Sequence, residues 1–243
     1  MQKRTIIFIT TLLFSHVLSG QNLLPESNQD FQFDYNMPEP IQFTSLQQAA
    51  QWADVVAVAQ VVNIDYQKTR DLNAKGQAFL TVRVPYKGVN KNDLLIVSAN
   101  GFEDHQCYYP DRENEGQRFL VFLKQSPLND NEYHGFKPFC QIQVLLDDSG
   151  RYYLRYPTDT DLKFDPDLIE EVTYQDPHAR VDATEWTSIK RDEYQAQFNT
   201  TLITEEDLFQ KYFYLKYSLG IPLSEIRPLL KVQRQADIHS DQM

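Results

Sequence analysis

The sequence predicts a mainly β protein, α+β overall. We expect a small closed or nearly closed antiparallel barrel, with a short helix before it and a helical hairpin after it. Six apolar or alternating segments follow one another at short intervals, as the strands of a barrel do, and only one early segment has helical spacing. The 243-residue chain is 42% hydrophobic and 13% aromatic, which is enough apolar material to bury a sizeable core.

The first twenty residues have the pattern of an export signal. Lys3 and Arg4 precede a short apolar run that ends at Leu18 and is followed by small residues. Because this run is too short to span a bilayer, we expect a signal peptide at 1–20 and a secreted or periplasmic chain with no integral membrane segment after signal removal. Residues 21–44 are rich in Asn, Gln, Pro and acids, and they are expected to form an extended leader arm.

The barrel is assigned to residues 45–157. Ser45 can cap a short helix that docks Trp52 on a sheet. Strand signals then follow in quick succession, and Asp-Asp-Ser-Gly at 147–150 is the clearest hairpin turn in the sequence. The predicted strands are 55–64, 79–84, 94–97, 119–123, 141–146 and 152–156.

Alternation along the second predicted strand assigns its faces. Leu80, Val82 and Val84 are apolar and alternate with two polar side chains. Because successive side chains of a strand point to opposite faces, we expect these three residues to share the buried face.

The chain after residue 157 changes in character. Residues 158–203 carry a large excess of acids and are expected to form a solvated acidic linker. Residues 204–243 have apolar and aromatic side chains at helical spacing, and Gly220 separates the two helices of a predicted hairpin. We expect the aromatic run Tyr212-Phe213-Tyr214 to pack in a core, and a surface for a partner is the alternative.

The two cysteines, Cys107 and Cys140, lie in the predicted barrel domain. In an oxidising compartment an even pair is most simply a disulfide. The alternative is a metal site, in which His105 and His134 would complete a Cys2His2 tetrahedron. The tight ligand spacing of structural zinc sites is missing, which favours the disulfide, and we expect no metal or other cofactor.

Three segments suggest a family. ADVVAVAQV at 53–61, VRVPYKG at 82–88 and GQRFLVFL at 116–123 resemble the OB-like barrels of the tissue-inhibitor-of-metalloproteinase and netrin-module group, particularly its exported bacterial relatives. The resemblance covers about 45–157. It implies a secreted OB-like barrel of five or six strands with a cysteine-tethered loop, a role consistent with Cys107. Inhibitors of that group use a cysteine at the mature N-terminus, which this chain lacks, so no inhibitory site is carried over.

The richest polar constellation lies in the long loop between the third and fourth predicted strands. This loop could supply an acid, a base and an arginine clamp, and loops are where barrels of this kind bind their ligands. We interpret it as a binding loop rather than a catalytic site, and the alternative is a surface loop of ordinary polar residues fixed by the disulfide. Its candidate residues are Glu103, Asp104, His105, Asp111 and Arg112.

Charge and motifs limit the function classes. The formal net charge of −11 leaves no basic stripe for phosphates, so we expect no nucleic-acid partner. The sequence contains no G-x-S-x-G nucleophile motif. We therefore expect an exported, non-enzymatic binding or interaction module whose partner is a protein or a surface glycan. The alternative is an exported hydrolase or metal-binding protein that uses the region of His105, Cys107, His134 and Cys140.

Overall fold

The fold was obtained as a computed structural model, which describes residues 42–68, 73–102, 106–109, 116–127, 129 and 131–232. The predicted signal peptide and nearly all of the predicted leader arm lie outside these ranges. The described residues belong to one compact unit, 39–243.

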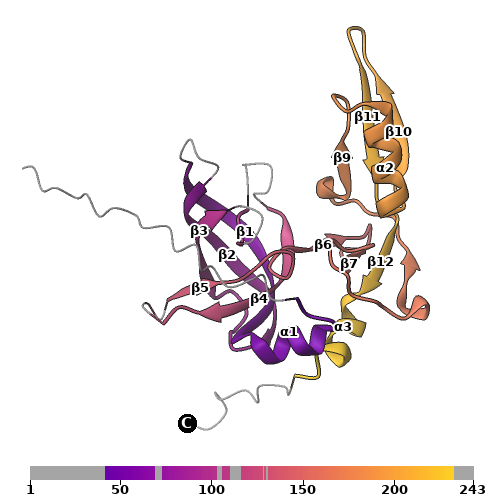
Figure 1. The fold of residues 1–243 in the computed structure, drawn as a ribbon. Helices are drawn as coiled ribbons and strands as arrows, with labels where there is room; N and C mark the ends of the chain where they lie inside the picture. Colours follow the sequence, from indigo (N-terminus) through magenta and orange to yellow (C-terminus); the bar gives the residue numbers. More distant parts are fainter. Residues whose placement is uncertain are drawn as a thin grey trace, which may run out of the picture. The chain divides into compact units, whose positions relative to one another are not determined.

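Five strands close into a barrel (Figure 1). Neighbouring strands follow the order β1-β2-β3-β5-β4, and β1 also pairs with β4. This confirms the mainly β fold class and the small OB-like barrel. The β3–β5 pair is parallel, so the barrel is not wholly antiparallel, and β5 was missed because it has only three residues. The strands are β1 (Val55–Lys68), β2 (Asn73–Lys87), β3 (Leu94–Phe102), β4 (Arg118–Gln125) and β5 (Glu132–His134).

A bulge changes the faces of β2. Leu80 and Val82 belong to the cluster of apolar side chains inside the barrel, as predicted. Val82 and Val84 pair with consecutive residues of β1, so Arg83 is an extra residue on its strand. A bulge of this kind shifts the alternation by one residue. The placement of Val84 on the same face is therefore wrong, because Val84 packs against a different cluster outside the barrel.

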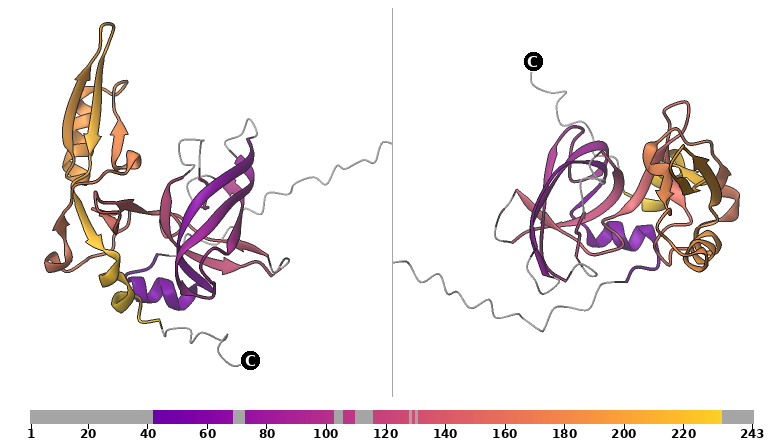
Figure 2. Two further views of the ribbon diagram at one scale, coloured as in Figure 1. Left: turned by 180° about the vertical axis from the view of Figure 1, so that it is seen from behind. Right: turned by 90° about the horizontal axis from the view of Figure 1, so that it is seen from above.

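Two helices cover that outer cluster, with α1 (Leu46–Trp52) packed on α3 (Leu223–Leu230), as two views show (Figure 2). The predicted cap of α1 is confirmed, because Oγ of Ser45 accepts a hydrogen bond from the backbone N–H of Gln48. Trp52 packs against this outer cluster.

Further strands extend the sheet beyond β4. β6 (Ile142–Leu146) pairs with β4 and with β7 (Tyr152–Tyr156), and the predicted 147–150 turn joins β6 to β7. β12 (Leu219–Pro222) pairs with β7 on one side and with β8 (Glu170–Glu171) on the other.

The segment predicted as an acidic linker contains regular structure. Two 3-10 turns, η2 (Pro166–Leu168) and η3 (Pro177–Ala179), each begin with an aspartate cap followed by proline. α2 (Ser188–Phe198) follows, capped by Thr187. The prediction of an open linker overlooked these caps, which satisfy backbone N–H groups at the start of each turn.

The prediction of a helix as the first half of a C-terminal hairpin is wrong. That region forms β10 (Thr201–Glu206) and β11 (Lys211–Lys216), and it then continues into β12. β11 pairs with β10 on one side and with β9 (Arg180–Asp182) on the other, in a second sheet. The apolar run in β11 satisfies both a helical and a strand period, and its pairing with β9 and β10 decides between them. The second predicted helix is confirmed as α3.

The predicted disulfide between Cys107 and Cys140 is confirmed. Their Cα atoms are 5.9 Å apart, and both residues are fully buried inside the barrel. The Cys2His2 alternative is wrong, because the disulfide uses both sulfur atoms. Among the described helices, none is long and apolar enough to cross a membrane.

Candidate functional site

The candidate residues of the predicted binding loop lie outside the described residues, although 106–109 of the loop are described. This holds for all five of its candidates, so their role stays a prediction. They are Glu103, Asp104, His105, Asp111 and Arg112. His134, named in the metal alternative, is described: it lies at the end of β5, partly buried beside Phe136, and burial lowers the pKa of its ring.

Described residues form a cleft of about 650 Å³. Its walls come from four parts of the chain: β1, the start of β4, the turn between β6 and β7, and the segment around η3. The lining residues are Gln60, Gly116, Arg118, Leu146, Asp147, Asp148, Ser149, Gly150, Gln175, Asp176, Pro177 and His178.

An ion pair joins the barrel to the η3 segment on the cleft wall. Nη1 of Arg118 lies 3.1 Å from Oδ2 of Asp176, whose side chain is 1% exposed. The Asp176 carboxylate also accepts hydrogen bonds from the backbone N–H groups of Leu146 at 3.2 Å and His178 at 3.0 Å. These donors occupy both of its oxygens, so Asp176 fixes the arginine and is poorly placed to act as a base.

The guanidinium of Arg118 keeps donors beyond this ion pair. The side chain is 17% exposed, and its Nε is buried without a hydrogen-bond partner in the part of the chain that the structure describes. The group also lies over the ring of Tyr152, 5.9 Å from its centroid. The guanidinium is thus held in place while part of its hydrogen-bonding capacity remains unused.

His178 faces the cleft from η3. Burial lowers the pKa of its ring, and Arg118 lowers it further, while the charge of Asp176 acts in the opposite direction. The ring is therefore neutral at pH 7, with one nitrogen that donates and one that accepts. A Cβ added at Gly116 would lie 3.8 Å from Nε2 of His178 and from Nε2 of Gln60, which places both side chains around this glycine.

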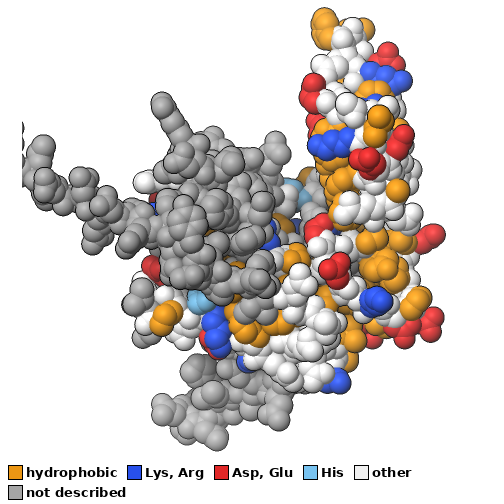
Figure 3. Space-filling view, viewed as in Figure 1, with side chains coloured by type: hydrophobic (Ala, Val, Ile, Leu, Met, Phe, Trp, Pro, Cys, Tyr) orange, Lys and Arg blue, Asp and Glu red, His pale blue; other side chains and the backbone are white. Residues whose placement is uncertain are grey.

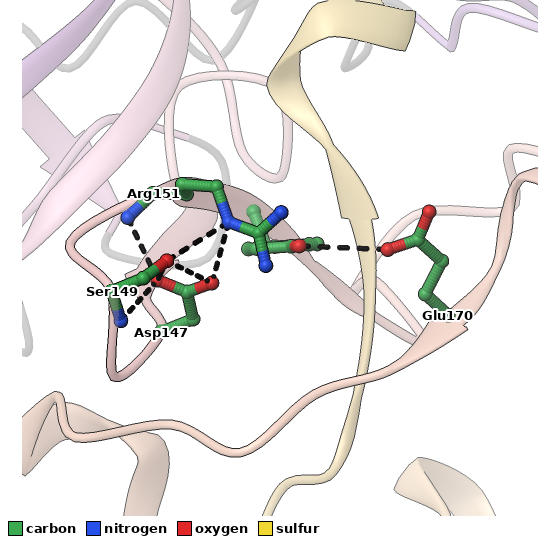
Figure 4. Close-up of polar contacts among 5 residues, drawn as sticks. Asp147, Ser149, Arg151 and Glu170 are labelled. Atoms are coloured by element: carbon green, nitrogen blue, oxygen red, sulfur yellow. Dashed lines mark hydrogen bonds and ion pairs between the residues drawn. The ribbon is translucent and has the colours of Figure 1, made fainter.

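The turn between β6 and β7 is fixed by Asp147 (Figure 4). Its Oδ1 accepts hydrogen bonds from the backbone N–H groups of Ser149 at 2.9 Å and Arg151 at 2.8 Å, and Oδ2 lies 2.9 Å from Nε of Arg151. Burial alone would raise the pKa of Asp147, but the bonds from Arg151 and Ser149 lower it to about 2. Asp148, next in the turn, is exposed.

The buried carboxylates of the cleft are paired with arginines. The two buried carboxylates of the cleft, Asp147 and Asp176, are each matched by one arginine, so their charges are compensated. The hydroxyl of Ser149 contacts the carboxylate of Asp147 rather than a histidine, so it lacks the base that nucleophilic catalysis needs. No cluster of three or more His, Cys, Asp or Glu side chains suited to a metal ion occurs in the described ranges.

Sequence reasoning missed this cleft. Asp176 counted only as one acid of a linker, and His178 as one of several histidines. A usable signal was present, because Asp-Pro occurs at 165–166 and again at 176–177, and aspartate before proline is typical of the start of a helical turn. The distance in sequence between Arg118 and Asp176 hid their contact.

Comparison of the chain with family models, with curated proteins and with solved structures found no match in any of the three.

Proposed function

We propose that the protein is an exported, non-enzymatic binding module whose cleft takes an uncharged, hydroxyl-rich ligand, the chemistry of a glycan. One observation carries this proposal: the buried carboxylates of the cleft are paired, while the partly exposed side chains of Arg118 and His178 line it beside them. Hydroxyl groups both donate and accept, so they match this mixture of donors and acceptors.

The charge of the cleft argues against an anionic ligand. Asp147 and Asp176 are each paired with an arginine, so the exposed carboxylate of Asp148 is the charge that an anion would meet. A neutral polyol avoids this repulsion and can still contact the imidazole. An open cleft also admits an extended ligand more readily than an enclosed cavity does.

Export is supported by the buried disulfide. Structural disulfides persist in oxidising compartments and are rare in a reducing cytosol. Together with the apolar segment after Lys3 and Arg4, this favours a secreted or periplasmic chain. Intact-mass measurement of the protein from its native host should show the loss of about twenty residues. A full-length product would contradict export.

The ligand proposal is tested by calorimetric titration with short neutral oligosaccharides and with a uronic-acid oligosaccharide of equal length. We expect a neutral oligosaccharide to bind, and His178→Ala to weaken that binding about fivefold, since a hydrogen bond contributes about 1 kcal/mol. His134→Ala is the matched control, because His134 is another partly buried histidine that lies outside the cleft lining.

Three results would reject the ligand proposal: no neutral oligosaccharide binds, the uronic-acid chain binds better, or both histidine variants weaken binding equally. The hydrolase alternative rests on His105, which lies outside the described residues, and it stays a prediction.

A further inference from the structure

The loop between β10 and β11 carries two adjacent apolar side chains in solvent. Leu208 and Phe209 are each 94% exposed, and we call this pair the apolar tip. Ile189 on α2 is 69% exposed and Leu94 is 55% exposed, and each of these stands alone. Single exposed apolar residues are common on proteins, whereas two large neighbours at nearly full exposure indicate an interaction site. Hydrophobic side chains gather at this end of the hairpin (Figure 3).

The apolar tip is held in one conformation by Asp207. Its Oδ1 accepts hydrogen bonds from the backbone N–H groups of Phe209 and Gln210, both at 2.8 Å, and its Oδ2 accepts one from the hydroxyl of Tyr212 at 3.0 Å. The backbone N–H of Asp207 donates in turn to the carbonyl of Gln210 at 3.0 Å. A loop fixed in this way loses little conformational entropy when it binds, so its apolar side chains are pre-organised for contact.

The hairpin below the tip is braced on both faces. On one face, the guanidinium of Arg180 lies 4.2 Å from the ring centroid of Tyr214 and pairs with Glu205 at 3.0 Å. On the other face, the guanidinium of Arg191 from α2 lies 4.3 Å from the ring centroid of Phe213. These contacts make the hairpin a stiff support that presents the tip away from the sheet.

The charges around the tip indicate which kind of partner it fits. Glu205 is paired with Arg180 and Lys211 follows the loop, so Glu206 and Asp207 leave a small excess of negative charge beside the tip. This acidic surrounding is repelled by anionic lipid headgroups. It is complementary to a protein surface that carries lysine and arginine.

We propose that Leu208 and Phe209 insert into an apolar pocket with a basic rim on a partner protein. This docking element is independent of the cleft, because none of the residues that hold it lines the cleft. A second copy of the chain is the alternative occupant, and the sedimentation measurement below distinguishes it.

The experiment places a photo-crosslinking amino acid at position 209, or at position 189 as a control, in the full chain within its native host. We expect one discrete product from position 209 that does not form from position 189. The captured protein is then purified, and its affinity for the wild-type chain is measured at low and high salt.

The double variant Leu208→Ser with Phe209→Ser should weaken that affinity by about a hundredfold, since both anchoring side chains are lost. Ile189→Ser and Leu94→Ser, which remove other exposed apolar side chains, should leave it within about twofold. High salt should weaken wild-type binding, because the proposed rim interaction is electrostatic.

Several results would overturn the proposal. These are equal products from both positions, affinity that the tip variant does not change, and binding to phosphatidylcholine vesicles with or without phosphatidylglycerol that needs the tip. Concentration-dependent self-association in sedimentation that is lost in the tip variant would also overturn it. Each leaves the cleft proposal untouched, because oligosaccharide titration measures a different surface.

Discussion

Two aspartates show how single residues shape the cleft. Asp147 and Asp176 are both buried, yet each is surrounded by backbone N–H groups and matched by one arginine. Hydrogen bonds to an ionised carboxylate stabilise the charged form, so burial does not neutralise these groups. The cleft is consequently built on charged side chains that serve as fixed structure.

Asp147 should make the free energy of unfolding depend on pH in the acid range. Its folded pKa of about 2 lies below the ordinary value near 3.9, so its stabilising contribution is complete above about pH 4 and is lost as the pH falls through 2. Urea unfolding of the wild type and of Asp147→Asn, from pH 6 to pH 2, checks this. The two should differ most above pH 4 and converge towards pH 2, and a constant difference would contradict the assignment.

Val82 and Arg83 provide a second test at this scale. Val82 is fully buried inside the barrel, whereas Arg83 is partly exposed at the bulge. We expect Val82→Asp to prevent folding, because it places an unpaired charge in the core. Arg83→Asp should still fold, losing mainly the hydrogen bond from its Nε to Gln60. Circular dichroism and thermal unfolding distinguish the variants, and equal effects would mean that the register is wrong.

Among the elements, those with one clear period could be predicted from sequence. β1, β2, β4, β6 and β7 carry apolar runs or alternation that only a strand explains. β11 is different, because its apolar residues are consecutive and Tyr212, Leu215 and Leu219 also repeat at helical spacing. Its pairing with β9 and β10 decides its structure, and a local sequence pattern does not predict such long-range pairing.

The cleft was hidden from sequence for the same physical reason. Arg118 begins a strand and Asp176 caps a short turn, and each has a sufficient local explanation. Only the fold brings the two groups to 3.1 Å. Burial is likewise a property of the folded chain, so the lowered pKa of His178 had no signal in the sequence.

Gly220 in β12 should be intolerant of a side chain. An added Cβ would lie 2.2 Å from the hydroxyl oxygen of Tyr174, which donates a hydrogen bond to the carbonyl of Leu219. Gly220→Ala should lower the free energy of unfolding by about 1–3 kcal/mol, as overpacking does. Gly150→Asn is the control: that turn position has open space and a positive φ, which asparagine adopts readily. Denaturant unfolding should show a clearly smaller loss for the control.

The disulfide is the remaining test at the level of elements. It joins the segment after β3 to the segment before β6 across 33 positions. Replacing both cysteines by alanine should lower the free energy of unfolding by about 3–4 kcal/mol, because the unfolded chain regains loop entropy. Urea unfolding at pH 7 measures the change, and a loss under about 1 kcal/mol would show that the bridge contributes little.

At the scale of the molecule, one apolar cluster links the two sheets. Leu145 and Tyr153 of the first sheet belong to it, and Val181 of β9 in the second sheet packs against it. A side chain packed between both sheets loses its contacts when either one opens. We therefore expect the described unit to unfold as a whole.

Fluorescence of the two tryptophans can test whether the two sheets unfold together. Trp52 lies in α1 beside the barrel, and Trp186 packs against Tyr194 of α2. Trp186→Phe and Trp52→Phe each leave one reporter, and the two fluorescence transitions in urea should have the same midpoint after correction for each variant's stability from circular dichroism. Separate midpoints would show that the sheets unfold independently.

The packing of α1 on α3 has a consequence for how the chain is made. Leu46 and Ile226 belong to one apolar cluster although 180 positions separate them. A ribosome must therefore synthesise residue 226 before the apolar face of α1 can be fully covered. Until then the nascent chain cannot complete its core.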